Sequence, residues 1–377
     1  MKKNSVLYYS FLFSFLFFAS CRHNGPDKSD KVKSVELEVH FHEESVSMSE
    51  EFTDFRIIPL ESRKECLLSN VCKMIVTDQN MYFWDKGPSS QVLRFDLNGK
   101  FNSRIGREGH AKGEYVSIQD IAATSKGDTI VMVNIPDICL YNKEGKYLSS
   151  LPIKNEKGIE NILFTDNAIY LGYFHRQENS VMAVYNKEAK RVADIVETQC
   201  DPIRKALGVD NASLLQQDGD YVICLDALNS CFYVSNKNNL KDVTKYSFKY
   251  EEMLTEDIAR KSVEDDEGLF RITSYQFHDG IVRGIISNNT EYYDFKFHLS
   301  ANTVDFMHHK EYDYSFACNH SGSFYYIVSA DVLSYYMDKS NPSHSPICEL
   351  LSDAFSELQG KILRTDNFYV IKMHVKK

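Results

Sequence analysis

The chain repeats one pattern that is clearest in RFDLNGKFNSRIGREGHAKGEYVSIQDIA, residues Arg94 to Ala122. Apolar and polar side chains alternate from Leu93 to Leu97 and again from Phe101 to Ile105, which is the period of a half-buried strand. Between these runs lies Asn98-Gly99, a pair that readily takes the positive φ angles of a tight hairpin turn. A glycine-rich loop then leads to a new predicted strand, Tyr115 to Ala122. A unit of this kind needs similar neighbours to cover its faces.

The pattern recurs with a period of roughly 40 to 60 residues, which indicates a repeat architecture. Each repeat opens with an apolar strand, a polar turn and a second strand. The opening turns are Asp78-Gln79-Asn80, Ser125-Lys126-Gly127, Asp166-Asn167, Asp218-Gly219, Asp279-Gly280 and Ser321-Gly322. A second turn follows in five repeats, at Asn98-Gly99, Glu144-Gly145, Glu188-Ala189, Asn238-Asn239 and Ser300-Ala301. Four strands joined by tight turns form a propeller blade, so the sequence predicts five complete blades and a sixth that begins at Tyr314.

Both ends of the chain are expected to complete the sixth blade. Two of its strands are predicted near Tyr314–Asn319 and Phe324–Ser329, and Phe368–Val375 supplies a third. Phe55–Leu60 is a short strand without a hairpin partner in the sequence. We therefore expect Phe55–Leu60 to pair with Phe368–Val375, because closing the ring removes two open sheet edges.

The predicted fold class is all-β: a six-bladed β-propeller of four-stranded antiparallel blades, closed by its N- and C-terminal strands. Short helices are predicted in loops, near Glu251–Val263 and after Ser345-Pro346, where a serine N-cap precedes a proline at the first helical position. The 23 Tyr and 24 Phe suit strands, since aromatic side chains fit a pleated surface. The formal net charge of −10 argues against nucleic acid as a partner.

The N-terminal residues read as a targeting segment. Residues 1–20 are predicted to be a lipoprotein signal peptide, whose apolar run Val6–Phe18 is too short for a stable membrane span. It ends in Phe18-Ala19-Ser20-Cys21, which resembles a bacterial lipobox, so Cys21 is the predicted lipidation site. The alternative is an ordinary secretory signal with a chance cysteine. Residues 21–50 are expected to be a flexible membrane tether, and residues 51–377 the propeller.

The other eight cysteines have irregular spacings and no CxxC pair, so buried thiols are expected in place of a zinc or redox site. Whether Cys224 and Cys231 face each other across a hairpin stays open. His40-Phe41-His42 puts two histidines on one strand face, but no third metal ligand lies nearby in the sequence. A solvated stretch is therefore the favoured interpretation.

A search for catalytic motifs assigns no catalytic, metal or cofactor residue. GxSxG, Walker A, HExxH and kinase signatures are all missing from the sequence. Gly106, Gly109 and Gly113 precede a strand, not a helix, so they are expected to shape a loop and not to hold a dinucleotide. His175-Arg176 follows a predicted strand, where the pair would either bind an anion or be solvated. His308 and His309 are adjacent in the sequence, so they are expected to point to opposite sides of a strand and not to share a metal ion. The acidic run Glu264–Glu267 lacks the alternating carboxylates of a calcium-binding loop.

The quoted segments also resemble a known family. RIGREGHAKGEYVSIQDIA is similar to the repeat boundary of NHL-type propellers. Most of Phe52–Lys377 resembles the six-bladed β-propeller lipoproteins of Bacteroides-type bacteria. The resemblance is carried by the segments FRIIPLE, VLRFDLNGKFNSRIGREGHAKGEY and DNFYVIKMHVKK, in this order. Lys112 and Phe368 stand where that family often has proline. The resemblance implies an outer-membrane lipoprotein; because Arg22 and His23, not acids, follow Cys21, it leaves the periplasmic and surface faces open.

Three functions are weighed from the sequence. The favoured one is a lipid-anchored, non-catalytic binding module that presents one face to a carbohydrate, peptide or protein partner. The alternative is a metal-dependent hydrolase or lyase with its site at the mouth of the central channel. The third is a structural subunit of a larger envelope assembly. Fold alone does not choose among them.

Overall fold

The computed structural model describes most of the chain from Val32 onward. The described residues are 32–42, 48–88, 90–124, 126–153, 158–173, 180–197, 215–226, 229–251, 253, 269–288, 290–308, 317–337, 358, 362 and 366–376. They all belong to one structural unit, Val32–Lys377. The two predicted helices near Glu251–Val263 and after Ser345-Pro346 lie almost wholly outside these residues.

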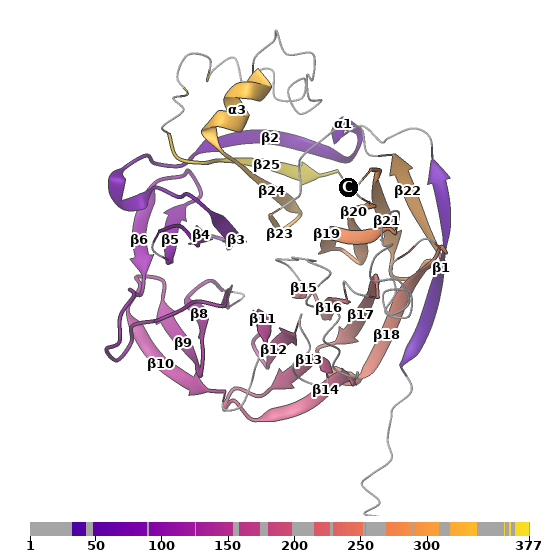
Figure 1. Cartoon of the computed structure of the whole chain (residues 1–377), viewed down its shortest axis with the longest axis horizontal. Helices are drawn as coiled ribbons and strands as arrows, with labels where there is room; N and C mark the ends of the chain where they lie inside the picture. The colour runs from indigo at the N-terminus through magenta and orange to yellow at the C-terminus, as the bar shows by residue number, and fades with distance from the viewer. Residues whose placement is uncertain are drawn as a thin grey trace, which may run out of the picture. The chain divides into compact units, whose positions relative to one another are not determined.

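Three antiparallel four-stranded sheets follow one another in sequence order (Figure 1). The first contains β3 (Val71–Val76), β4 (Asn80–Asp85), β5 (Gln91–Asp96) and β6 (Phe101–Ile105). The second contains β7 (Asp120–Ala123), β8 (Thr129–Asn134), β9 (Asp137–Asn142) and β10 (Tyr147–Pro152). The third contains β11 (Ile159–Phe164), β12 (Ile169–Tyr173), β13 (Ser180–Tyr185) and β14 (Arg191–Glu197). The predicted all-β class with four-stranded antiparallel sheets is confirmed, as are the hairpin turns within these sheets.

Two further antiparallel groups share one nine-stranded sheet. One group contains β15 (Leu215–Asp218), β16 (Tyr221–Asp226), β17 (Cys231–Asn236) and β18 (Asn239–Lys249). The other contains β19 (Arg271–His278), β20 (Ile281–Ser287), β21 (Tyr292–His298) and β22 (Thr303–His308). Between β18 and β22 lies β1 (Lys33–His42), which is parallel to both.

The place of β1 corrects the expectation that residues 21–50 form a flexible tether. Lys33–His42 is a paired strand, and it is followed by the short helix α1 (Met48–Glu51). Val35, Leu37, Val39 and Phe41 alternate with polar residues, and Leu37 is fully buried. This period-two pattern was the available signal, because it is typical of a strand that turns one face to the core. Residues 21–31 lie outside the described chain.

The last sheet combines the second strand of the described chain with its three C-terminal strands. It contains β23 (Cys318–His320), β24 (Ser323–Val328), β25 (Tyr369–Val375) and β2 (Phe52–Pro59). The register places Arg56 opposite Lys372 and Pro59 opposite Tyr369, which confirms the predicted pairing of these two segments. The helix α3 (Ala330–Met337) was not predicted; Ser329 caps it by accepting the N–H of Val332 at 3.3 Å. Among the described helices, none is long and apolar enough to span a membrane.

Sheets are covered on both faces, which explains why their second strands are apolar at nearly every position. All six residues of β4 are buried. Phe83 packs with Val370 of the last sheet, whereas its neighbour Tyr82 points the other way and packs with Met132 of the second sheet. Successive side chains of a strand point to opposite faces, so each such strand contributes to two interfaces.

Buried polar side chains join the first strands of neighbouring sheets. Asp120 of β7 accepts the N–H of Ile162 in β11 at 2.7 Å, and Asn161 of β11 accepts the N–H of Leu215 in β15 at 3.0 Å. Gln216 of β15 makes a comparable bond to the backbone of β19. The first strands also touch in order: β3 contacts β7, β7 contacts β11, β11 contacts β15, β15 contacts β19, β19 contacts β23, and β23 contacts β3.

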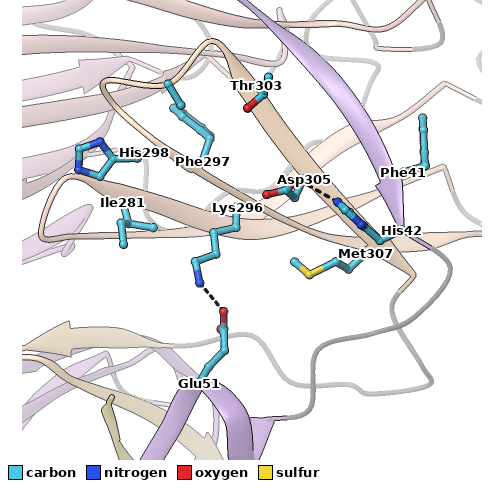
Figure 2. A pocket seen from close by; sticks show the side chains of 11 residues that line it. Phe41, His42, Glu51, Ile281, Lys296, Phe297, His298, Thr303, Asp305 and Met307 are labelled. Carbon is cyan, nitrogen blue, oxygen red and sulfur yellow. Dashed lines mark hydrogen bonds and ion pairs between the residues drawn. The ribbon is translucent and has the colours of Figure 1, made fainter. Parts of the chain in front are cut away.

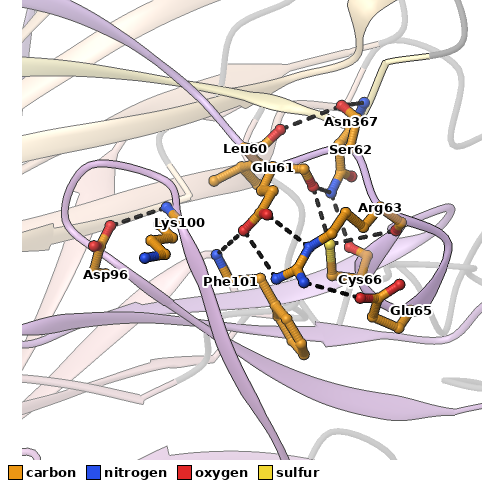
Figure 3. A network of polar contacts seen from close by, with 10 residues as sticks. All are labelled: Leu60, Glu61, Ser62, Arg63, Glu65, Cys66, Asp96, Lys100, Phe101 and Asn367. Atoms are coloured by element: carbon orange, nitrogen blue, oxygen red, sulfur yellow. Dashed lines mark hydrogen bonds and ion pairs between the residues drawn. The ribbon is translucent and has the colours of Figure 1, made fainter.

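A network of polar contacts connects the last sheet to the first (Figure 3). Buried Asn367 donates to the carbonyls of Glu61 and Cys66 at 2.9 and 2.8 Å, and its Oδ1 accepts the N–H of Leu68 at 3.0 Å. The Asn98-Gly99 turn packs nearby: Gly99 has φ +84°, and a Cβ there would lie 2.1 Å from the Pro59 carbonyl oxygen. Only glycine satisfies both requirements at this position.

Candidate functional site

A groove of about 770 Å³ lies where β1, β21 and β22 face α1 (Figure 2). A volume of this size lies within the range of small-molecule sites, about 300–1,000 Å³. Its lining mixes charged, polar and apolar side chains. The lining residues are Phe41, His42, Glu51, Ile281, Lys296, Phe297, His298, Ala301, Thr303, Asp305 and Met307.

Strand register brings the polar side chains of the groove together. Lys296 and His298 are two apart on β21, so they project from the same face of the strand. Asp305 of β22 lies opposite Lys296 on one side and opposite His40 of β1 on the other. His42, two residues beyond His40, then contacts Asp305, with 2.8 Å between Nε2 and Oδ1.

Glu51 of α1 lies between two cations. Its Oε1 is 2.5 Å from Lys296 Nζ, and its Oε2 is 3.4 Å from Arg283 Nη1. Arg283 is 8% exposed and lies over the rings of Phe52 and Phe324, at 5.6 and 5.0 Å from their centroids. Burial lowers the pKa of the Arg283 guanidinium, and the negative charge of Glu51 opposes this effect. Within the described residues, Arg283 Nε has no hydrogen-bond partner.

Ser300 holds the His298 ring at the edge of the groove, with its Oγ 2.7 Å from His298 Nδ1. The backbone N–H of Ser300 donates to His298 Nδ1 at 3.1 Å. A neutral imidazole that accepts at Nδ1 carries its proton on Nε2. The edge of the ring that carries Nε2 lies beside the turn at Gly280, 2.9 Å from where a Cβ of that residue would be.

At the end of β1, Phe41 holds an aromatic ring in a fixed position beside the groove. Phe41 is 49% exposed, yet its ring makes edge contacts with Tyr250, Tyr293 and Phe306 at centroid distances of 5.3, 5.5 and 5.5 Å. Such edge-to-face pairs fix the orientation of a ring. Phe306 and Tyr293 alternate with Asp305 and Lys296 along their strands, so this ring lies on the opposite face of the sheet from the charged side chains of the groove.

The model of one protein family matches residues 32–374, which is nearly the whole described chain. The family is described as "Domain of unknown function (DUF4934)". The chain belongs to the DUF4934 family. No curated protein matches it.

Solved structures share the architecture of this DUF4934 chain at low sequence identity. A Bacteroides fragilis NCTC 9343 protein described as exported aligns with a TM-score of 0.69 and 14% identity, covering 92% of this chain and 100% of that one. A member of the DUF4221 family from Bacteroides vulgatus ATCC 8482 aligns with a TM-score of 0.55 and 10% identity, covering 86% and 98%. The WD40 repeats of RRP9 align with a TM-score of 0.45 and 10% identity, covering 73% and 77%. At these identities the likeness to the two Bacteroides proteins shows the fold alone.

Among the candidate site residues that the structure describes, His42 lines the groove. Cys21, His175-Arg176 and the acidic run Glu264–Glu267 lie outside the described residues. His40 and His42 share one face of β1 as predicted, and His42 lines the groove beside Asp305. Across the described chain, no group of three His, Cys, Asp or Glu side chains is arranged to hold a metal ion.

Other sequence predictions have structural outcomes in this DUF4934 chain. Gly106 and Gly113 take φ angles of +63° and +82° in the loop before β7, which confirms their predicted role in shaping it. The six described cysteines are thiols. Cys224 lies opposite Tyr233 and Cys231 opposite Asp226, so the two cysteines are not directly paired across the hairpin.

Sequence reasoning missed Glu51, Arg283 and Lys296. Glu51 is 232 residues from Arg283 and 245 residues from Lys296 along the chain, so no local spacing in the sequence connects them. One usable signal was the alternation YYDFKFH in β21, which puts Lys296 and His298 on the face opposite Phe295 and Phe297.

Proposed function

We propose that the chain forms a closed six-bladed propeller. The six four-stranded antiparallel groups, the antiparallel pairing of β2 with β25, and the contacts of the first strands from β3 round to β23 and back to β3 support this. In this arrangement β1 is an additional strand on the rim, between the outer strands of the fourth and fifth blades. The polar network around Asn367 would then fasten the last blade to the first.

We infer that the protein is anchored in the outer membrane of the cell envelope through lipid on Cys21. The lipobox-like Phe18–Cys21 supports this, as does the likeness to a Bacteroides protein described as exported. Cys21→Ala is expected to move the protein from the membrane fraction to the soluble fraction, because one acyl-modified residue carries the attachment. Cys72→Ala is the matched control and should stay membrane-bound. Retention of the Cys21→Ala protein in membranes would refute lipidation.

We propose that this propeller is a non-catalytic binding module, and that the groove between β21, β22 and α1 is its ligand site. The observation that carries the proposal is a pre-arranged mixed surface: Lys296 and the His42–Asp305 pair beside the apolar side chains of Ile281 and Met307 (Figure 2). Ligand sites combine apolar contact area with a few placed polar groups in this way. The ligand classes to test are carbohydrate, peptide and protein.

Blocking the groove tests this proposal. The soluble Cys21→Ala protein is screened on arrays of envelope glycans and peptides, and then Thr303→Trp is introduced. Thr303 is on the outer strand β22 and lines the groove, so an indole there should lower affinity at least tenfold, about 1.4 kcal/mol. Val192→Trp adds the same ring on the outer strand β14, where Val192 is 54% exposed, and should leave binding unchanged. Equal affinity of Thr303→Trp and the unmodified protein would exclude the groove as the site.

A further inference from the structure

β1 is held between two sheet edges mainly by backbone pairing (Figure 1). Lys33–Glu38 pairs with β18 on one side, and Glu38–His42 pairs with β22 on the other. Both ladders are parallel, and parallel pairing is slightly less stable per residue than antiparallel pairing. Leu37 is the one buried side chain among the ten residues of β1, whereas all six residues of β4 are buried. The strand is therefore attached with much less apolar burial than an inner strand.

The side-chain contacts of β1 are weak except at its C-terminal end. Glu38 is 3.3 Å from Lys249 Nζ, but these two side chains are 64% and 63% exposed. The His42–Asp305 pair is also half exposed. Exposed ion pairs contribute little, because water and salt screen them. The strongest side-chain hold at this end is the ring of Phe41, which packs against three other aromatic rings.

The sheets beside β1 do not need it to complete their own pairing. β18 pairs with β17, and β22 pairs with β21, both antiparallel. Without β1 each group keeps four strands, which is the number found in the three sheets β3–β6, β7–β10 and β11–β14. A segment that buries little and completes no sheet can open at a lower free energy than the whole fold.

The next segment of the chain is fixed firmly. Glu51 of α1 contacts Lys296 Nζ at 2.5 Å and Arg283 Nη1 at 3.4 Å, and its carbonyl accepts the N–H of Lys376 at 2.9 Å. Phe52, which begins β2, is 4% exposed. Opening that starts at β1 therefore ends at α1, because Glu51 and Phe52 hold the chain there.

We propose that β1 is a detachable strap, which leaves its place between β18 and β22 while the neighbouring sheets stay folded. With the strap docked, residues 22–32 connect the proposed lipid on Cys21 to the fold, and they span at most about 40 Å. With the strap undocked, residues 22–47 make this connection and span at most about 90 Å. The strap thus sets how far the propeller reaches from the membrane. This consequence for reach rests on the proposed lipid anchor, whereas the undocking itself does not.

Thiol labelling of the Cys21→Ala protein tests the undocking. Leu37→Cys introduces a thiol that is buried only while β1 is docked, and the native Cys231 of β17, which is fully buried, is the matched internal reference. Iodoacetamide, followed site by site by mass spectrometry, should modify the Leu37→Cys thiol at least a hundredfold faster than Cys231. Hydrogen exchange in the protein that retains Leu37 should show the same order for β1 and β17. Equal rates at the two thiols would overturn the proposal.

Two variants separate the opening of β1 from the unfolding of the whole protein. Phe41→Ala removes ring contacts made by β1, so it should speed labelling of the Leu37→Cys thiol tenfold or more and leave Cys231 unchanged. Asp120→Ala removes a buried carboxylate that joins two other sheets, so it should speed labelling of Cys231 and leave the Leu37→Cys thiol unchanged. Faster labelling of Cys231 in Phe41→Ala would show that β1 and the sheets open together, and the strap would be overturned.

Leu37→Pro tests the consequence for reach, because a proline inside a strand removes a backbone donor and disfavours pairing. Neutron reflectometry of the lipidated protein on a supported bilayer should place the propeller on the order of 10 Å farther from the membrane in this variant, as expected for flexible chains of the two lengths. An unchanged distance would overturn the role in reach. Failure of both proteins to attach would refute the lipid anchor, and the thiol test would still decide whether β1 undocks.

Discussion

Replacing Asn367 with Ala is expected to lower the free energy of unfolding by about 4 kcal/mol, as the sum of several buried polar groups left unsatisfied at about 1–3 kcal/mol each. Its side-chain nitrogen donates to the carbonyls of Glu61 and Cys66, and its side-chain oxygen accepts the N–H groups of Leu68 and Phe368, at 2.8 to 3.0 Å. Alanine supplies none of these bonds, and the side chain is almost fully buried, so water is a poor replacement. Urea unfolding, followed by the fluorescence of the one tryptophan, Trp84 in β4, measures the change.

Two further variants make this test specific. Asn367→Asp keeps the acceptor oxygen but places a second acceptor oxygen against the Glu61 and Cys66 carbonyls, so it should be at least as unstable as Asn367→Ala. Asn238→Ala, at an exposed hairpin turn, should stay within about 0.5 kcal/mol of the unmodified protein. A loss at Asn367→Ala as small as that at Asn238→Ala would show that the network does not hold the first and last sheets together.

Phe368 adds two backbone bonds to the network around Asn367. Its N–H donates to Asn367 Oδ1 at 3.0 Å. Proline has no N–H, so Phe368→Pro would remove this bond. The carbonyl of Phe368 accepts the N–H of Leu60 at 3.1 Å, which links it to the segment after β2.

The hairpins were predictable because their information is local. Asn98-Gly99 and the alternating residues around it specify β5, the turn and β6 without reference to the rest of the chain. The pairing of β2 with β25 followed from counting strands, since a strand without a sequence neighbour needs a distant one. The strand β1 was missed although Val35, Leu37 and Val39 alternate, because the polar composition around them was given more weight than their period.

The groove was not predictable because it depends on register between distant segments. Lys296 faces Glu51 only if β21, β22 and α1 take their observed places, and a one-residue slip of β21 would turn Lys296 to the other face. Arg283 illustrates the same point. Its sequence context, an apolar strand, predicts burial but does not say that Glu51 will reach it from a segment 232 residues away.

The second large effect is expected at Asp120, which links three sheets. Its carboxylate is 1% exposed, lies 2.7 Å from Lys73 Nζ of β3 and accepts the N–H of Ile162 of β11 at 2.7 Å. Asp120→Ala should lower the free energy of unfolding by about 3–5 kcal/mol, the usual cost of breaking a buried ion pair from one side. Asp220→Ala is the matched control, because the Asp220–Lys237 pair has a similar distance, 3.0 Å, but a carboxylate that is 59% exposed. Exposed pairs contribute about 0–1 kcal/mol.

The pH dependence gives this prediction a second readout. Burial raises the pKa of the Asp120 carboxyl, and the nearby charge of Lys73 opposes this. A raised pKa in the folded state means that the folded protein holds this proton more tightly than the unfolded chain. Stability from this group is therefore lost as pH rises through the folded-state pKa. Lys73→Met should make that loss larger, because the carboxylate then ionises in the core without its cation.

The double variant Lys73→Met with Asp120→Leu separates two explanations of the loss. If the cost of Asp120→Ala comes from the ammonium group of Lys73 left without a partner, removing both charges should recover most of it, since apolar replacements of buried pairs are often neutral or stabilising. If the cost comes instead from the bond to Ile162, the double variant should stay as unstable as Asp120→Ala. Urea unfolding of the four proteins at one pH distinguishes the two, and equal stability of Asp120→Ala and Asp220→Ala would contradict both.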